Sequence, residues 1–140
     1  MIDALVALAA DVPPGCDGLA CEPYFHGSRH DPDKRASFTG ITAANLTPGH
    51  MARAVMEGMA RTFAASYHRL RGLRGPASLL AGAGNGLRAN PLLCRMVEES
   101  FGLPLVLPAH REEAAYGAAL VAAVGAGLHP GFLHARSVRE

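Results

Sequence analysis

Tryptophan is absent from this chain of 140 residues, and lysine occurs once, at Lys34, beside twelve arginines. The formal net charge is only +1, and the basic residues are spread along the sequence. The chain therefore lacks the basic patch that nucleic-acid-binding domains need, which argues against a nucleic-acid partner. It also lacks an apolar run near the roughly 20 residues of a membrane-spanning helix. Its first three residues lack the basic start of a secretory signal. We expect a cytoplasmic protein without a membrane partner.

Cysteine is also scarce, with three residues at Cys16, Cys21 and Cys94. An odd number of cysteines in a chain without a secretory signal argues against a disulfide framework, so we expect reduced thiols. Cys94 has no histidine one helical turn away, so we do not expect it to act as a nucleophile.

A zinc site is the alternative for the first two cysteines. Cys16, Cys21, His26 and His30 are all of residue types that bind zinc, and they follow the pattern Cys-x4-Cys-x4-His-x3-His. Structural zinc sites usually join two ligand pairs across a turn or helix, whereas only four residues separate these pairs. We therefore expect ordinary loop residues and no metal site, and a small zinc-stabilised binding module stays as an alternative.

The sequence does contain an alternation of helix and strand patterns. The length and the 49% hydrophobic content predict one globular domain. The order strand, helix, strand, helix after a long helix predicts an α/β fold with parallel strands. Helices are expected at 2–10, from Thr47 and Pro48 to a break at 72–76, at 91–101 and at 112–126, and extended segments at 19–22, 37–42, 77–81 and 103–107.

The longest predicted helix carries apolar residues at helical spacing. They form one stripe, which we expect to be buried, while Arg53, Glu57 and Arg61 follow at intervals of four on another face. The members of the stripe are Met51, Val55, Met59, Phe63, Tyr67 and Leu70.

A glycine-rich stretch at 79–93 is the feature around which the other patterns are arranged. It reads as a short buried strand, a loop with Gly82, Gly84 and Gly86, and a helix that begins at Asn90 and Pro91. Asn can accept a hydrogen bond from the first free N–H groups of a helix, and Pro at the next position loses no needed donor. A loop of this kind suits a ligand with anionic or ribose groups, and it also occurs as a plain strand-to-helix turn.

From about Gly18 to Gly127 the chain resembles the C-terminal domain of the FGGY family of carbohydrate kinases. Four blocks carry the resemblance at natural spacing: 27–32 (GSRHDP), 50–58 (HMARAVMEG), 82–93 (GAGNGLRANPLL) and 112–120 (EEAAYGAAL). Within the family, the loop form Gly-x-Gly-x-x-Leu-x-x-Asn and the Gly-x-Arg-His-Asp-Pro run are most similar to the branch that phosphorylates sedoheptulose.

The resemblance implies an α/β, ribonuclease-H-like fold of the actin and hexokinase type, of which the chain has only the C-terminal half, with a mixed sheet and flanking helices. Residues 1–127 would form this partial domain, with an atypical leading helix and loop, and 128–140 a C-terminal tail. The glycine loop would hold the adenosine end of ATP. The helix near 112–120 would lie at the hinge between the two kinase domains. The implied nucleotide-binding residues are Gly82, Gly84, Asn85, Leu87 and Asn90, and the implied hinge residues are Glu113 and Gly117.

Residues for the chemical step are missing. Phosphoryl transfer to a sugar hydroxyl needs a carboxylate near the nucleophile and a magnesium site. All five Asp residues lie in the first quarter of the chain, in its leading helix or in loops. We therefore expect no catalytic residue here, and ATP, Mg²⁺ and a sedoheptulose-like ketose to be used only together with an N-terminal kinase domain. The chain would be a domain fragment, a truncated gene product or half of a two-chain enzyme.

A non-catalytic function is the other alternative. The apolar first helix and the small residues of the last one would suit a dimerisation or regulatory module, because a half kinase exposes a surface that its other half would cover. The expected partners are thus ATP and either a second copy of the chain or a complementing chain.

Overall fold

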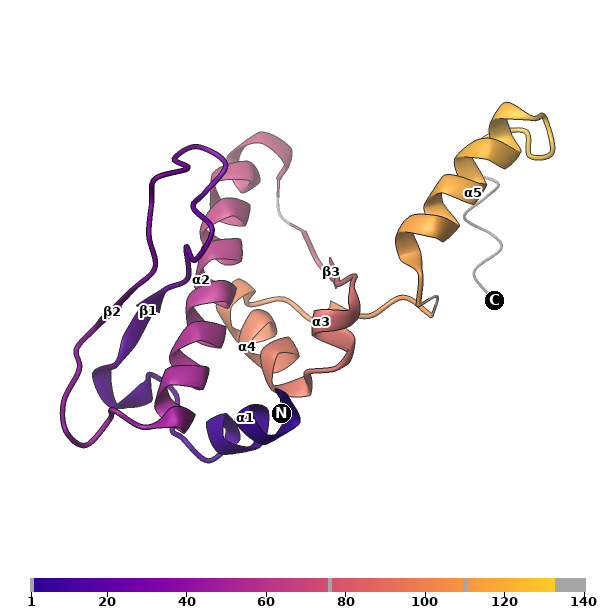
Figure 1. Ribbon diagram of the computed structural model, residues 1–140. Coiled ribbons are helices and arrows are strands. Elements are labelled where there is room, and N and C mark those ends of the chain that lie inside the picture. The colour runs from indigo at the N-terminus through magenta and orange to yellow at the C-terminus, as the bar shows by residue number, and fades with distance from the viewer. Residues whose placement is uncertain (1, 76, 110, 133–140) are drawn as a thin grey trace.

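The computed structural model describes residues 2–75, 77–109 and 111–132, and Figure 1 shows a long central helix with smaller elements around it. The elements in chain order are α1 (Ile2–Ala10), η1 (Cys16–Gly18), β1 (Ala20–Glu22), β2 (Ser37–Thr39), α2 (Pro48–Arg74), β3 (Leu80–Ala81), α3 (Asn85–Arg88), α4 (Pro91–Phe101), β4 (Leu105–Val106) and α5 (Glu113–Gly125). The predicted mixture of helices and strands is confirmed. The short helix α3, inside the predicted glycine loop, was missed.

The strands of the described residues form two separate pairs. β1 and β2 are antiparallel, with Cys21 opposite Phe38. β3 and β4 are parallel, with Leu80 opposite Leu105, as the strand–helix–strand order predicted. The prediction of a buried strand at 77–81 was wrong, because β3 has only two residues and Leu79 is half exposed.

Helix α2 is the element against which α1, β1 and α4 all pack. Two glycines allow the close approach. A Cβ at Gly49 would lie 2.7 Å from the carbonyl oxygen of Leu8, and one at Gly58 would lie 2.3 Å from that of Cys21. Glycine at these positions therefore brings α1 and β1 close to the axis of α2.

The apolar stripe predicted for α2 is buried only in part, because Val55 and Met59 pack against the hydrophobic clusters and the larger residues beside them do not. Phe63 is 55% exposed and Leu70 is 60% exposed, and Met51 is also exposed. The buried apolar positions are instead Ala54, Met56, Ala60 and Ala64. Because several elements pack on α2 from different sides and approach it closely, small residues face them and some large residues are left outside.

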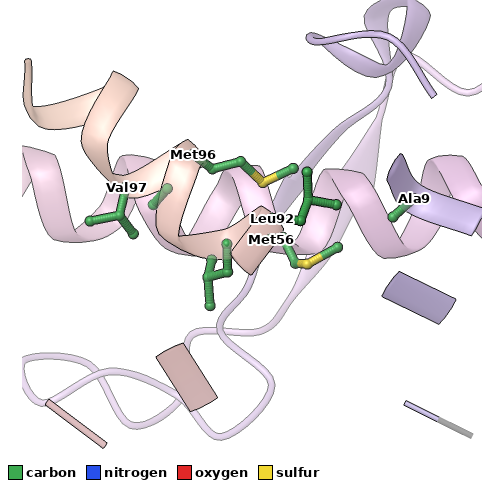
Figure 2. Close-up of a cluster of buried hydrophobic side chains, with 7 residues drawn as sticks. Ala9, Met56, Leu92, Met96 and Val97 are labelled. Carbon is green, nitrogen blue, oxygen red and sulfur yellow. The ribbon is translucent and has the colours of Figure 1, made fainter. Parts of the chain in front are cut away.

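The main hydrophobic core lies between α1, α2 and α4 (Figure 2). The spacing of apolar residues in 91–101 predicts that Leu92, Leu93, Met96, Val97 and Phe101 point inward. The first four are buried members of this core, and Phe101 packs at the edge of the cluster. Helix α1 packs on α2 through Ala9 and Val6, and leaves Ile2, Leu5 and Leu8 exposed. The buried members of this core are Ala9, Met56, Ala60, Leu92, Leu93, Met96 and Val97.

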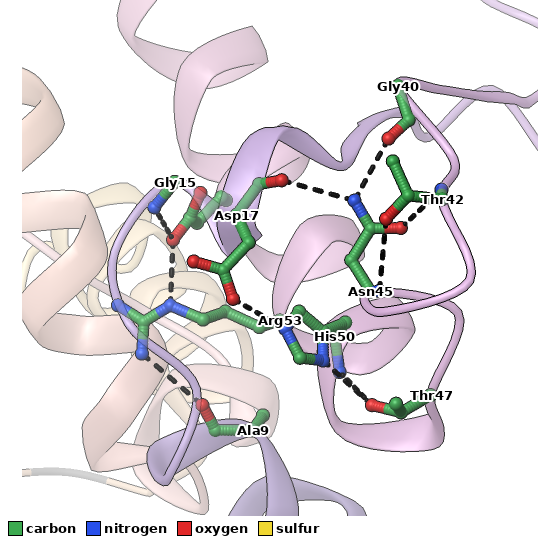
Figure 3. Close-up of polar contacts among 10 residues, drawn as sticks. Ala9, Gly15, Asp17, Gly40, Thr42, Asn45, Thr47, His50 and Arg53 are labelled. Carbon is green, nitrogen blue, oxygen red and sulfur yellow. Dashed lines mark hydrogen bonds and ion pairs between the residues drawn. The ribbon is translucent and has the colours of Figure 1, made fainter.

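A polar network joins the loops at the start of α2 (Figure 3). Asp17, a non-glycine residue with positive φ, contacts Nε2 of His50 through Oδ2 at 3.0 Å. Nδ1 of the same imidazole lies 2.7 Å from Oγ1 of Thr47, so His50 belongs to the capping structure of the helix.

Arg53 is buried, although the sequence placed it on a polar face. It is 6% exposed, and its Nη1 donates to the carbonyl oxygen of Ala9 at 3.2 Å. Its Nε donates to Oε1 of Glu57, four residues further along the helix, at 2.8 Å. The same oxygen accepts from the backbone N–H of Gly15 at 3.1 Å. Arg53 and Glu57 therefore tie the end of α1 to α2.

Helix α5 extends away from the other elements (Figure 1), and none of its residues is buried. It is one residue shorter at each end than the predicted helix at 112–126, and Gly127 with φ of 74° follows it. Of the predicted tail at 128–140, the structure describes 128–132, and the rest lies outside the described residues.

Candidate functional site

The glycine loop connects β3 to α3, and its glycines have different roles. Gly82 is buried, and its N–H donates to the carbonyl oxygen of Val106 at 2.9 Å. A Cβ there would lie 2.8 Å from a methyl group of Leu105 and 2.9 Å from one of Leu87. Gly84, just before α3, has φ of 99° and ψ of 153°, a conformation essentially restricted to glycine. Gly82 is thus needed for close packing and Gly84 for the path of the backbone.

Asn90 caps α4, as the sequence predicted. Its Oδ1 accepts a hydrogen bond from the N–H of Leu93 at 3.0 Å. Its Nδ2 donates to the sulfur of Met56 at 3.1 Å. The side chain of Leu87 is half-buried and packs against the main core. Asn90 and Leu87 therefore fix the end of the glycine loop to the body of the protein.

An open pocket of about 470 Å³ lies beside α3. It is lined by Asn85, Arg88, Ala89, Leu107 and Arg111. Asn85 is therefore the one predicted nucleotide-binding residue that lines this pocket. The two arginines were not among the predicted site residues, because their distance in the sequence hides the fact that both lie at the same pocket. They give it a positive charge, part of which the ion pair between Arg88 and Glu113 offsets, and the remainder suits an anionic ligand.

Arg88 also connects the pocket to α5. Its Nε donates to Oε1 of Glu113 at 3.0 Å, and its Nη2 contacts the same oxygen and the carbonyl oxygen of Pro108. The hydrogen bond from Arg88 is the main reason why the pKa of Glu113 is lower than its ordinary value. Glu113, predicted to lie at a hinge, thus ties the first turn of α5 to α3. Gly117, the other predicted hinge residue, has open space where a Cβ would lie.

A second pocket, of about 420 Å³, lies between α1, α2 and α4. Its lining has mixed charge, with Arg53 and Arg95 beside Asp11 and Glu99. The guanidinium of Arg53 already donates to Glu57 and to the backbone of Ala9. This pocket therefore has a weaker attraction for anions than the one beside α3.

The residues of the zinc alternative are not brought together. Cys16 and Cys21 are buried in a second, smaller hydrophobic cluster, and His26 and His30 are exposed. Burial raises the pKa of the Cys16 thiol to about 11, with a further contribution from Glu57, so the thiolate that zinc requires is disfavoured. Within residues 2–75, 77–109 and 111–132, no three His, Cys, Asp or Glu side chains form a group that could hold a metal ion. Cys16, Cys21, His26 and His30 therefore do not form a zinc site.

None of the helices in the described part of the chain has both the length and the apolar character needed to cross a membrane.

Comparison with known proteins identifies the family. Residues 2–126 match the model of the C-terminal domain of the FGGY family of carbohydrate kinases. The chain belongs to this family. All four sequence blocks that carried the resemblance lie inside the matched residues, so the predicted family is confirmed.

Individual FGGY kinases agree with this assignment. Gluconokinase from Bacillus subtilis is 30% identical over 129 residues, which cover 89% of this chain and 25% of that protein. Sedoheptulokinase from Mus musculus is 31% identical over 103 residues, which cover 74% of this chain and 21% of that protein. The chain thus spans about a quarter of the length of these relatives.

The crystal structure of xylulose kinase from Rhodospirillum rubrum is similar in fold. It superposes with a TM-score of 0.77 and 34% identity, over 89% of this chain and 25% of that one. The likeness to FGGY kinases confirms the predicted ribonuclease-H-like fold of the actin type. The relatives are named for gluconate, sedoheptulose and xylulose, so family membership leaves the sugar unspecified.

Proposed function

We propose that this chain binds the adenosine end of ATP in the pocket beside α3, as part of an ATP-dependent carbohydrate kinase. The observation that carries the proposal is the pocket of about 470 Å³, which lies next to the glycine loop and offers the polar groups of Asn85, Arg88 and Arg111. Its volume falls within the range of small-molecule sites. Membership of a kinase family supports the same ligand.

In this proposal, the predicted nucleotide-binding residues either face the nucleotide or determine the shape of the loop. Asn85 is exposed at the pocket and offers an amide to the base or ribose. Gly84 sets the backbone path into α3. Gly82, Leu87 and Asn90 act indirectly, because their contacts determine the shape of the loop and fix its place on the protein. Arg88 and Arg111 place positive charge in the pocket wall, which suits the phosphates of ATP.

Transfer of the γ-phosphoryl group to a sugar hydroxyl needs groups that we do not assign to this chain. A base for the hydroxyl and ligands for a divalent metal are required, and the described residues hold no such metal-binding group. We infer that protein regions like those of the relatives outside the matched residues supply both. The proposed cofactors are therefore ATP and Mg²⁺, the latter bound elsewhere.

A ketose of the sedoheptulose type is the sugar that we propose. Its support is the tract Gly27 to Pro32, where the motif resembles that of sedoheptulose-phosphorylating kinases, together with the relative from Mus musculus. The cytoplasm is the compartment that we expect, and the three free cysteines agree with a reducing environment.

Calorimetric titration with ATP and with adenosine tests the proposed pocket. The Gly84→Ala variant forces a residue with a Cβ into a glycine-only conformation, and we expect it to weaken binding about tenfold. Gly86→Ala is the matched control, because Gly86 has no positive φ and open space where a Cβ would lie. Binding by this control should change less than about twofold.

Two results would contradict the proposal. A wild-type chain that is folded by circular dichroism but binds neither ATP nor adenosine would exclude the pocket as a nucleotide site. Equal affinities of the Gly84→Ala and Gly86→Ala variants would exclude the glycine loop from it.

Sugar-dependent formation of ADP by this chain alone would show that the chemical step does not need other regions.

A further inference from the structure

Helix α5 is weakly attached to the rest of the protein. It extends away from the other elements in Figure 1, and none of its residues is buried. Val121 on this helix, for example, is 58% exposed. The orientation of α5 must therefore depend on contacts at its first turn and on the segment that leads into it.

Arg88 makes contacts of this kind. From α3 it donates two hydrogen bonds to one carboxylate oxygen of Glu113, in the first turn of α5. It also donates to the carbonyl oxygen of Pro108, in the segment before α5. The two side chains are only 21% and 19% exposed, so water screens the pair less than a pair on the open surface.

The same arginine lies in the wall of the pocket beside α3. One side of this pocket comes from α3 and the residue after it, through Asn85, Arg88 and Ala89. The other side comes from the segment that leads into α5, through Leu107 and Arg111. A ligand in the pocket therefore contacts both sides, and the Arg88–Glu113 pair holds these two sides together.

We propose that the Arg88–Glu113 ion pair couples occupancy of the nucleotide pocket to the orientation of α5, with Glu113 as a positioning residue that does not touch the ligand. This coupling rests on the proposed function. A bound nucleotide holds Leu107 and Arg111 against α3, and the pair passes that restraint on to the first turn of α5. The effect is reciprocal, so any contact that holds α5 in this orientation strengthens nucleotide binding by the same factor.

The variant Glu113→Gln tests the coupling with adenosine as the probe. Glu113 does not line the pocket, and adenosine is uncharged, so a change in net charge has little effect on its binding. Loss of the pair should weaken adenosine binding by about threefold to fivefold, the range that partly exposed ion pairs give. Glu112→Gln is the matched control, because the neighbouring Glu112 is exposed and its side chain makes no capping hydrogen bond. Its affinity should equal that of the wild type.

Hydrogen exchange of the α5 amides gives a second measurement. In the wild type and in Glu112→Gln, saturating adenosine should slow exchange in the first turns of α5, and in Glu113→Gln it should not. If Arg88 acts only as a direct ligand, Glu113→Gln removes the carboxylate charge beside its guanidinium, and ATP binding stays equal or becomes tighter. That outcome, or equal protection of α5 in both variants, would overturn the coupling alone. A wild-type chain that does not bind adenosine would overturn the proposed function, and the coupling with it.

Discussion

Asn45 joins two segments of the chain, the loop between β2 and α2 and the turn at Asp17, through one fully buried side chain (Figure 3). Its Oδ1 accepts from the N–H of Thr42 at 2.8 Å. Its Nδ2 donates to the carbonyl oxygens of Asp17 at 3.1 Å and Gly40 at 2.9 Å. Every hydrogen bond goes to backbone, so the side chain substitutes for regular secondary structure where the chain has none.

Replacement of Asn45 by Ala should lower the free energy of unfolding by about 2 to 3 kcal/mol, because partly buried backbone groups of three residues lose their partner. Urea denaturation followed by circular dichroism measures this change. Asn85→Ala is the matched control, since Asn85 is exposed and should cost less than about 0.5 kcal/mol. Similar costs for the two variants would mean that the Asn45 network contributes little stability.

Single residues differ in how well the sequence predicts them. The cap at Asn90 could be predicted because all its determinants are local, namely an Asn, a Pro and an apolar run that follows. The buried positions of Asn45 and Arg53 could not be predicted. Their partners are as far away in sequence as Asp17 and Ala9, and only the tertiary structure brings those backbone oxygens to them.

At the scale of elements, α2 shows how packing outweighs intrinsic preference. Glycine inside a helix normally costs about 1 kcal/mol relative to alanine. Helix α2 contains Gly58, where a Cβ would meet the carbonyl oxygen of Cys21 at 2.3 Å, and Gly72, where it would meet nothing within 4 Å. The same substitution should therefore have opposite effects at the two positions.

We expect Gly72→Ala to raise the free energy of unfolding by up to about 1 kcal/mol. Gly58→Ala should lower it by about 2 kcal/mol or more, because β1 has to move away from α2. Thermal and urea unfolding of the two variants measure the difference. Stabilisation by Gly58→Ala would show that β1 does not press against α2 as the structure places it.

The same helix shows why a stripe of large apolar residues does not identify the whole buried face. A count of large apolar residues at helical spacing selects the face with Phe63 and Leu70, both more than half exposed. The buried positions are mostly alanines, which carry little weight in such a pattern. The sequence contains the small residues, but it does not say that neighbouring elements approach α2 from several sides.

At the scale of the whole molecule, the attachment of α5 depends on an ionised carboxylate. The pKa of Glu113 lies below its ordinary value of 4.5, chiefly because Arg88 donates to it. A group whose pKa is lower in the folded state stabilises that state above its unfolded pKa. This stabilisation is lost as the pH falls through the folded pKa.

An NMR titration should therefore find the Glu113 pKa below 4.5 in the wild type and higher in Arg88→Gln. Hydrogen exchange in the first turn of α5, corrected for its intrinsic pH dependence, should become faster as Glu113 takes up its proton. Glu112, which is exposed and next in sequence, serves as the internal reference. An unchanged Glu113 pKa in Arg88→Gln would contradict the contact.

The sequence by itself determined the family, the α/β class, the parallel pairing of β3 with β4, the inward face of α4 and the Asn90 cap. These features depend on residue spacing within short segments and on sequence motifs. Both can be recognised without knowing how distant segments pack together. The tertiary structure alone decided that Arg88 and Arg111 share a pocket with Asn85 and that α5 is joined to α3 through Glu113. Such contacts join residues more than twenty positions apart, and their geometry is set by the packing of the whole chain.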